Sequence, residues 1–391
     1  MRPPKGWSRT SRSTFASLQR RAFPEPGRGT GRGRAGREGS RTSPWSSTGG
    51  WREGTRRWPP NSPSGFTPWT PRGAWKRFTG ESSRSWRIAV SFKSARWAVE
   101  FAAVQSLAHL VSRLTPATRR SLGRALGSAV YLLDARHRRV ALHNLERALP
   151  ALSSRERRAV ARGAFSHLGR LLVEILEHKE PPTALLGRCR FEGLEHLRAA
   201  AEAGRGYFLV SAHFGNWERV ALLQAALGYP LWMITRPLDN PRLEAFLARR
   251  RESTGNRVIH KRRAVREMVK GLREGRGIAL VIDQNFGEPG RVFVPFFGRP
   301  AATTPVLGSL AVRTGAAVLP VFAFPEEGGW YRIVYGPPIE APSTGDPEAD
   351  AISVTAAATA RIEEAVRACP GAWFWMHRRW RTRPDGPDDG P

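Results

Sequence analysis

Residues 206–227 read GYFLVSAHFGNWERVALLQAAL and contain the passage from a predicted strand to a predicted helix. The apolar run at 206–212 has the length of a buried strand. Gly215 permits a tight turn after it, and Asn216 can cap the helix expected at 216–227. This pattern places His213 at the end of a buried strand and Glu218 in the first turn of the helix that follows.

The alternation of strands and helices continues toward the C-terminus. Further strands are expected at 230–235, 277–283, 291–297, 316–324 and 330–336, and further helices at 240–253, 304–314 and 348–368. Strands that alternate with helices indicate an α/β fold, with a mostly parallel sheet flanked by helices. Ligands bind beyond the carboxyl ends of strands in such sheets, so we expect the chemistry in the loops after Ala212, Thr235 and Asp283.

Helices are predicted to precede the sheet. The pair Ser153 and Glu156 has the spacing of a capping box and opens a long helix. The stretch 92–114 has apolar residues at helical spacing, but Glu100 and His109 interrupt it, so it is no clean membrane-spanning helix. Its basic flanks suit an interfacial or weakly spanning anchor, and the alternative is an ordinary core helix. The predicted helices are 92–114, 117–134, 136–148 and 153 to about 178.

The chain of 391 residues carries 63 Lys and Arg against 33 Asp and Glu, a net charge of +30. Many of the arginines lie on the predicted N-terminal helices. They form either solvated helix faces or a surface that meets lipid phosphates or an acidic carrier protein. These arginines are Arg119, Arg120, Arg124, Arg136, Arg138, Arg139, Arg155, Arg157 and Arg158.

Residues 1–90 differ from the rest, with 19 Lys and Arg against 4 Asp and Glu, and with seven of the 14 Trp. Gly and Pro interrupt every apolar run, which predicts a disordered tail. Arg and Gly repeats with aromatic residues would also suit an RNA-binding arm. Since the next methionine after Met1 is Met233, a start near Val90 would make this tail an extension of the gene model.

Cysteine usage excludes two kinds of organisation. Cys189 and Cys369 lie 180 residues apart and belong to no CxxC pair. Neither a disulfide framework nor a cysteine-based zinc site can therefore organise the fold, and a reducing compartment is favoured.

His213 and Glu218 have the spacing His-x4-Glu. A histidine paired with a carboxylate can remove a proton from an alcohol, because the acid fixes the tautomer and stabilises the imidazolium. The chain has no G-x-S-x-G sequence for a nucleophilic serine, and no second histidine stands at metal-ligand spacing from His213. The simplest chemistry is attack of a substrate hydroxyl, deprotonated by His213, on an activated acyl group. A core histidine with an incidental acid is the alternative.

Two further blocks follow predicted strands. Arg236 lies at the end of the strand at 230–235, where it could bind a phosphate, stabilise an oxyanion or form an ordinary salt bridge. Asp283 and Gln284 lie where the chain leaves the strand at 277–283. The Phe-rich segment 292–297 either lines a trough for an acyl chain or is a core strand.

The order of these blocks resembles the late acyltransferases of lipid A assembly, within the lysophospholipid acyltransferase superfamily with its H-x4-[DE] motif. The blocks are HFGNWE, RPLDNP, DQNFG, VFVPFFG, ATTP and AAVLPVF. Upstream, RRVALHNLERALPALSSRERR (138–158) is similar to a basic helix of that family. Downstream, WFWMHRRWRTRP (373–384) is similar to its closing aromatic and basic segment, which suits a lipid–water interface or a core strand. The resemblance covers about residues 92–384.

The resemblance implies the roles of the residues. His213 is the general base and Glu218 the acid that orients it, while Arg236 contacts a phosphate or an oxyanion. Substrate-side roles are further implied for the matching positions Gly215, Asn216, Asp283, Gln284 and Thr303.

The resemblance also implies the reaction and its setting. A fatty acyl group passes from acyl carrier protein, or from acyl-CoA, to a hydroxyl of a lipid A precursor or related glycolipid. No cofactor and no metal are expected. The partners are acyl carrier protein, an anionic glycolipid or phospholipid acceptor and a membrane surface, without nucleic acid. The expected location is the cytoplasmic side of the bacterial inner membrane.

Two alternatives remain open at this point. The same chemistry could act on a lysophospholipid or a phosphatidylinositol mannoside, or the chain could be a basic protein that binds nucleic acid or membrane surfaces. We divide the chain into a tail (1–90), a helical membrane-anchoring region (91–180), an α/β catalytic core (181–384) and a disordered end (385–391).

Overall fold

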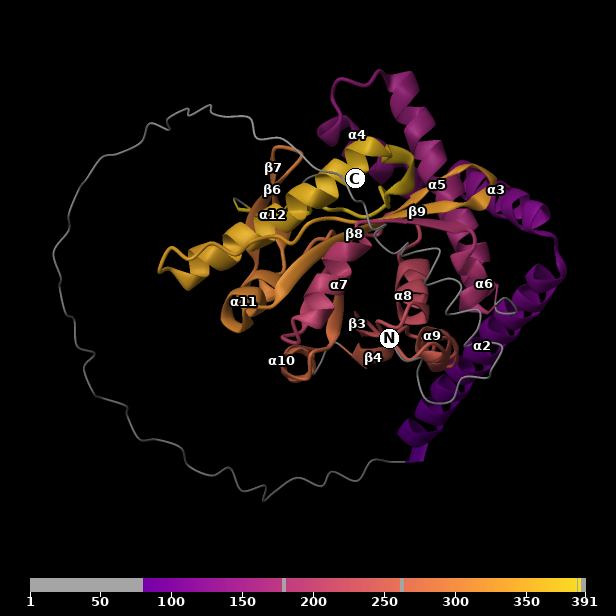
Figure 1. Cartoon of the computed structure of the whole chain (residues 1–391). Helices are drawn as coiled ribbons and strands as arrows, with labels where there is room; N and C mark the ends of the chain where they lie inside the picture. Colours follow the sequence, from indigo (N-terminus) through magenta and orange to yellow (C-terminus); the bar gives the residue numbers. More distant parts are fainter. Residues whose placement is uncertain (1–79, 178–180, 261–263, 385, 388–391) are drawn as a thin grey trace, which may run out of the picture.

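A computed structural model describes residues 80–177, 181–260, 264–384 and 386–387 (Figure 1). The strands of its main sheet lie in the order β1-β9-β8-β2-β5-β3-β4. From β8 to β4 every neighbouring pair is parallel, whereas β9 runs antiparallel to β8 and pairs in parallel with β1. The predicted α/β fold with a mostly parallel sheet is therefore confirmed. The strands are β1 (Cys189–Glu192), β2 (Tyr207–Ser211), β3 (Leu231–Thr235), β4 (Arg257–His260), β5 (Gly277–Val281), β8 (Ala317–Pro325) and β9 (Tyr331–Tyr335).

Strand β2 is apolar throughout because both of its faces are covered. Successive side chains of a strand point to opposite faces, so Tyr207 and Leu209 enter one core while Phe208 and Val210 enter another. The first core contains residues from α6 (Pro182–Leu186), α7 (Leu194–Glu202) and α8 (Trp217–Ala226). The second contains residues from α10 (Ala264–Arg273), α11 (Val306–Thr314) and α12 (Pro347–Ala368). Figure 1 shows α12 on one side of the sheet and α7 and α8 on the other.

The helices before the sheet are α2 (Gly80–Arg113), α3 (Pro116–Leu133), α4 (Ala135–Ala148) and α5 (Ser154–Leu176). The predicted capping box is present at the start of α5, where Ser153 and Glu156 bond each other's backbone N–H groups. Helix α2 begins at Gly80, so residues 80–90, which we expected in the tail, are helical. The rest of that expected tail, 1–79, lies outside the described residues.

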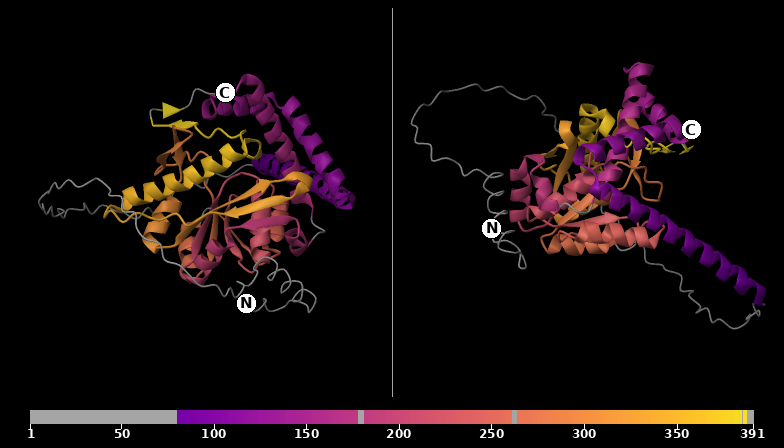
Figure 2. Two further views of the ribbon diagram at one scale, coloured as in Figure 1. Left: turned by 45° about the horizontal axis from the view of Figure 1, so that its top comes forward. Right: turned by 90° about the vertical axis from the view of Figure 1, so that its right-hand side faces the viewer.

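The N-terminal half of α2 extends away from the body of the protein (Figure 2). Its C-terminal half packs on α5 and on α9 (Pro241–Glu252), where Asn240 donates hydrogen bonds to the Trp97 carbonyl at 3.0 Å and to the Glu100 carboxylate at 3.1 Å. No helix in the described part of the chain is long and apolar enough to cross a membrane.

The strand expected at 291–297 is present as β6 (Val292–Phe296), but it lies outside the main sheet. It forms an antiparallel hairpin with β7 (Arg299–Thr303) and packs on α12. The elements β1, β4, β7, α6, α7 and α10 were not predicted. At the C-terminus, β10 (Thr382–Arg383) pairs with β11 (Gly386–Pro387), two residues of the expected disordered end; the remainder of that end, 385 and 388–391, lies outside the described residues.

Helices α3 and α5 approach so closely that glycine is required at their contact. A Cβ atom on Gly127 would lie 2.1 Å from the carbonyl oxygen of Phe165, which is backbone and cannot move aside. Gly163, also on α5, has room for a Cβ atom, which would lie in ordinary van der Waals contact at 3.8 Å from Cα of Gly371.

We expect Gly127→Val to destabilise the protein by roughly 1–3 kcal/mol, because overpacking forces the two helices apart. Gly163→Ala is the matched control and should leave the melting temperature equal or slightly higher, since alanine favours a helix more than glycine does. Thermal denaturation followed by circular dichroism measures both. A Gly127→Val protein that melts like the wild type would contradict the close packing of α3 on α5.

Candidate active site

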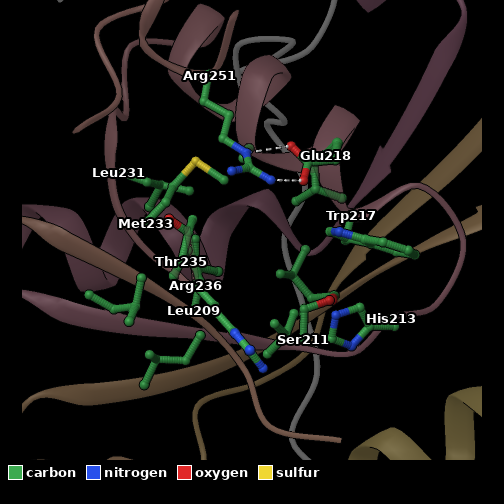
Figure 3. Close-up of a pocket in the computed structure, with 17 residues that line it drawn as sticks. Leu209, Ser211, His213, Trp217, Glu218, Leu231, Met233, Thr235, Arg236 and Arg251 are labelled. Carbon is green, nitrogen blue, oxygen red and sulfur yellow. Dashed lines mark hydrogen bonds and ion pairs between the residues drawn. The ribbon is translucent and has the colours of Figure 1, made fainter. Parts of the chain in front are cut away.

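The carboxyl ends of three neighbouring parallel strands meet at one edge of the sheet. His213 follows β2, Asp283 follows β5 and Arg236 follows β3. A cavity of about 260 Å³ opens here (Figure 3). Its apolar wall comes from β2, α8, β3, β5 and β8. The polar side chains that line it are Ser211, His213, Glu218, Thr235, Arg236 and Arg251. This is the edge at which the sequence predicted the chemistry.

The turn after β2 holds His213 in place. Gly215 has a φ of +57°, and a Cβ atom there would lie 1.7 Å from the carbonyl oxygen of Ala323, so no side chain fits. The Gly215 carbonyl accepts a hydrogen bond from Nε2 of buried His167 at 3.0 Å. As predicted, Asn216 caps α8, because its side chain accepts from the backbone N–H of Arg219 at 2.8 Å.

Asp283 is the carboxylate that contacts His213. Its Oδ1 lies 2.8 Å from Nδ1 of the imidazole, and its Oδ2 accepts the backbone N–H of His213 at 2.9 Å. Nε1 of Trp373 donates to the same Oδ2 at 2.8 Å. Asp283 is 3% exposed. Because Nδ1 donates to this carboxylate, Nε2 of the imidazole is left as the proton acceptor.

The surroundings of the pair favour its charged form. Burial would raise the pKa of Asp283, but the charge of His213 and the hydrogen bonds from His213 and Trp373 lower it to about 2. Burial of the imidazole opposes its protonation, yet the charge and hydrogen bond of Asp283 and the charge of Glu218 together raise the pKa of His213 above its ordinary value. An imidazolium that forms at His213 is therefore stabilised.

We predicted that Glu218 orients the imidazole of His213, but the carboxylate of Glu218 has another partner. Its carboxylate binds the guanidinium of Arg251 on α9 through two hydrogen bonds, at 2.6 Å and 3.0 Å (Figure 3). The first turn of α8 presents Glu218 to α9, while the loop after the adjacent strand β5 brings Asp283 to Nδ1. Glu218 thus acts on His213 through its charge across the cavity, and the orienting contact belongs to Asp283.

Arg236 reaches the cavity from the end of β3, with an exposed side chain. No described residue forms a hydrogen bond or ion pair with it, so the ordinary salt bridge considered for this residue is not found in the described part of the chain. Its five N–H donors remain available to a ligand.

Several residues predicted to face a substrate have other surroundings. Thr303 is completely buried, and its hydroxyl accepts from Nη2 of Arg379 at 2.6 Å. Asn216 is 2% exposed and donates to Glu174 at 2.6 Å in addition to capping α8. Gly215 shapes the turn and Asp283 holds His213. Gln284 is exposed, and its carbonyl accepts from Arg379 at 3.2 Å. None of these five lines the cavity.

The Phe-rich segment does not line the cavity either. Phe296 is fully buried, 5.5 Å from the ring of Trp373 and stacked on Trp380 at 5.7 Å between ring centroids. The core alternative is therefore the right one for this segment. The apolar cavity wall comes from other residues: Leu209, Val220, Ala221, Leu231, Met233, Ile234, Ala279, Leu280, Val281 and Val321.

The aromatic and basic segment 373–384 packs in the core and forms hydrogen bonds with His213 and Asp283. Trp373 and Trp375 are 2% and 0% exposed, so they lie in the core and not at a lipid–water interface. The backbone N–H of Phe374 donates to the His213 carbonyl at 3.0 Å. Buried Asn144, from the basic helix α4, donates to the carbonyls of Trp375 at 2.8 Å and His377 at 2.7 Å.

Of two basic residues in this segment, Arg379 is buried and His377 is partly buried. Arg379 is 0% exposed and donates to the Ala302 carbonyl at 2.6 Å; burial lowers its pKa to about 10. Burial lowers the pKa of His377 to about 4, so the neutral ring accepts the backbone N–H of Asn285 at 2.7 Å through Nε2. In the described ranges, no group of three or more His, Cys, Asp or Glu could hold a metal ion.

The site combines the buried carboxylate of Asp283, the imidazole of His213 and the free guanidinium of Arg236 at the mouth of an apolar cavity. Such a site is suited to deprotonate a hydroxyl that lies beside an apolar substrate chain. Residues 89–382 match the family model described as bacterial lipid A biosynthesis acyltransferase, so the chain belongs to this family and is an acyltransferase.

Similar proteins agree with this assignment. The chain is 29% identical over 268 residues to the lipid A biosynthesis lauroyltransferase of Escherichia coli (strain K12), covering 68% of this chain and 86% of that protein. It is equally identical over 268 residues to the palmitoleoyltransferase of the same strain, covering 68% and 85%. It is 30% identical over 192 residues to a phosphatidylinositol mannoside acyltransferase of Mycobacterium tuberculosis (strain CDC 1551 / Oshkosh), covering 48% and 58%.

We expect Asp283→Asn to lower the pKa of His213, because the negative charge and the charge-assisted hydrogen bond on Nδ1 are both lost. Glu218→Gln should lower that pKa less, since Glu218 acts only through its charge. Histidine-labelled NMR, with His213→Gln to assign the resonance, measures both titrations. A larger decrease in Glu218→Gln than in Asp283→Asn would contradict the pairing described here.

Proposed function

We propose that this acyltransferase moves a fatty acyl group from acyl carrier protein, or from acyl-CoA, to a hydroxyl of a lipid A precursor or a related glycolipid. The observation that carries the proposal is the hydrogen-bonded pair of His213 and Asp283 at the mouth of an apolar cavity. The family of the chain and the names of its relatives support a glycolipid acceptor.

In the reaction that we propose, Nε2 of His213 takes the proton of the acceptor hydroxyl as its oxygen attacks the thioester carbonyl. A carbon–oxygen bond forms and the carbonyl oxygen becomes an oxyanion. The carbon–sulfur bond then breaks, and the leaving sulfur receives the proton from Nε2. Asp283 holds Nδ1–H throughout and stabilises the imidazolium, so His213 ends neutral, as it began.

We assign the remaining groups by their positions. Arg236 has donors free to bind the oxyanion or a phosphate of the acceptor. The apolar wall of the cavity receives the acyl chain. Glu218 adds negative charge near the imidazolium, and its two hydrogen bonds to Arg251 join α8 to α9 beside the cavity.

We expect His213→Ala to lower acyl transfer by about 10²–10⁴-fold, the usual size of a general-base contribution, and Asp283→Asn by at least about tenfold. Glu218→Gln should reduce it less than Asp283→Asn. His260→Ala is the matched control, because His260 also ends a parallel strand of this sheet, yet does not line the cavity. Activity should rise with pH through the pKa of His213, since only the neutral imidazole accepts a proton.

The assay offers acyl carrier protein and CoA thioesters to the full chain with three acceptors: a lipid A precursor, a phosphatidylinositol mannoside and a lysophospholipid. Mass spectrometry of the products identifies the acceptor that is acylated. The mannoside is included because of the relative in Mycobacterium tuberculosis. Wild-type rates in His213→Ala would refute the assigned base, whatever the acceptor.

We further propose that α2 and α3 bind the surface of a bacterial inner membrane, on its cytoplasmic side. Large apolar side chains are exposed on both helices, including Val99 at 70%, Leu132 at 68% and Leu133 at 84%. Basic residues such as Lys93 and Arg113 flank the apolar part of α2, an arrangement that favours an anionic interface.

We expect Leu132→Ser/Leu133→Ser to reduce binding to vesicles that contain anionic lipid, because the apolar area available for insertion falls. Sedimentation with the vesicles measures the bound fraction. Val265→Ser on α10 is the control, since Val265 is also exposed, at 49%, but lies on another helix. Equal losses in both variants would contradict a membrane-binding face on α3.

A further inference from the structure

A second cavity, of about 200 Å³, lies beside the first turn of α8. Trp217 and Glu218 line the active-site cavity, whereas the next residue, Arg219, lines this one. Its walls come from α3, α5, α8 and the turn between β8 and β9. Five arginines and two carboxylates line it: Arg119, Arg120, Arg170, Arg188, Arg219, Glu174 and Glu177.

The two carboxylates do not balance the positive charge of this cavity. Glu177 forms an ion pair with Arg119. Glu174 lies 3.7 Å from Arg219, but its Oε2 already accepts hydrogen bonds from Asn216 at 2.6 Å and from the Tyr331 hydroxyl at 2.9 Å. Five guanidinium groups therefore face two carboxylates in a confined space, which concentrates a positive potential there.

Arg170 shows the imbalance most directly. Its side chain is 17% exposed and its Nη2 is 3.9 Å from Glu174, too far for a hydrogen bond. Nε and Nη2 of Arg170 are both buried and donate to no described residue. Buried N–H groups of a charged side chain are costly to leave without an acceptor, so these two donors indicate a ligand.

Arg120 stands at the rim of the same cavity. The backbone of Gly329 packs against it, since a Cβ atom on Gly329 would lie 2.9 Å from Cδ of Arg120. In the described part of the chain, Arg120 has no hydrogen-bond or ion-pair partner. Its guanidinium can therefore turn toward a ligand without breaking an existing contact.

We propose that this cavity binds a phosphate-type anion, a phosphomonoester or diphosphate group. Planar guanidinium groups donate paired N–H bonds that match phosphate oxygens, and several of them can surround one tetrahedral group. Such an anion gives Arg170 the acceptors it lacks and neutralises the excess charge. The phosphate can belong to a lipid headgroup or to a soluble molecule. The inference does not depend on the acyl-transfer mechanism, because His213 and Asp283 take no part in it.

Calorimetric titration with inorganic phosphate and with diphosphate at low ionic strength tests this site in the full chain. We expect Arg170→Gln and Arg120→Gln to weaken binding at least tenfold. Arg361→Gln is the matched surface control, since Arg361 pairs with Glu364 on the exposed face of α12 and its variant should bind phosphate like the wild type. Arg120→Gln removes no hydrogen bond or ion pair among the described residues, so it tests the site even if Arg170→Gln fails to fold.

A second arm compares vesicles of phosphatidylcholine with and without phosphatidic acid, whose headgroup is a phosphomonoester. Arginine-dependent binding of the soluble anions supports the site with a soluble ligand, and arginine-dependent binding of the phosphatidic acid vesicles alone supports it with a lipid ligand. The proposal is overturned if neither probe depends on Arg170 and Arg120.

Discussion

The arrangement of the site depends on one buried carboxylate, that of Asp283. It accepts hydrogen bonds from the imidazole and the backbone of His213 and from the indole of Trp373. These three bonds join the loops after β5 and β2 to a segment that begins 90 residues after Asp283. A buried charge is tolerated when every bond it needs is made, so the carboxylate fixes three parts of the backbone at once.

Two acids stand near the imidazole and act in different ways. Asp283 forms a hydrogen bond with Nδ1 of His213, whereas Glu218 forms its hydrogen bonds with Arg251. Glu218 therefore acts on His213 only through its charge. The charge of Glu218 still raises the pKa of the imidazole. The His-x4-Glu spacing therefore places an acid close enough to act on His213 electrostatically, although the two side chains form no hydrogen bond. The ion pair of Glu218 and Arg251 also joins α8 to α9. Asn240, which caps α9, forms hydrogen bonds with α2.

The sequence predicts local structure here well and the contacts of the site less well. The strand at 206–212, the turn at Gly215 and the cap at Asn216 follow from the residues that form them. The partner of His213 does not, because it depends on β5 lying next to β2 although β3 and β4 come between them in the chain. With that strand order known, Asp283 could have been predicted as the carboxylate that contacts His213. The burial of Trp373 could not be predicted either, because an aromatic and basic segment has the same composition whether it faces lipid or lies in a core.

The segment that begins at Trp373 is made by the ribosome after every other part of the site. Until it emerges, Asp283 lacks its indole donor, the His213 carbonyl lacks the N–H of Phe374, and Arg379 cannot reach the carbonyls of Gln284 and Ala302. A nascent chain can thus form its sheet and still hold an unfinished active site. The site is therefore assembled only after this segment has been synthesised, and the same segment completes the core with Trp373, Trp375 and Trp380.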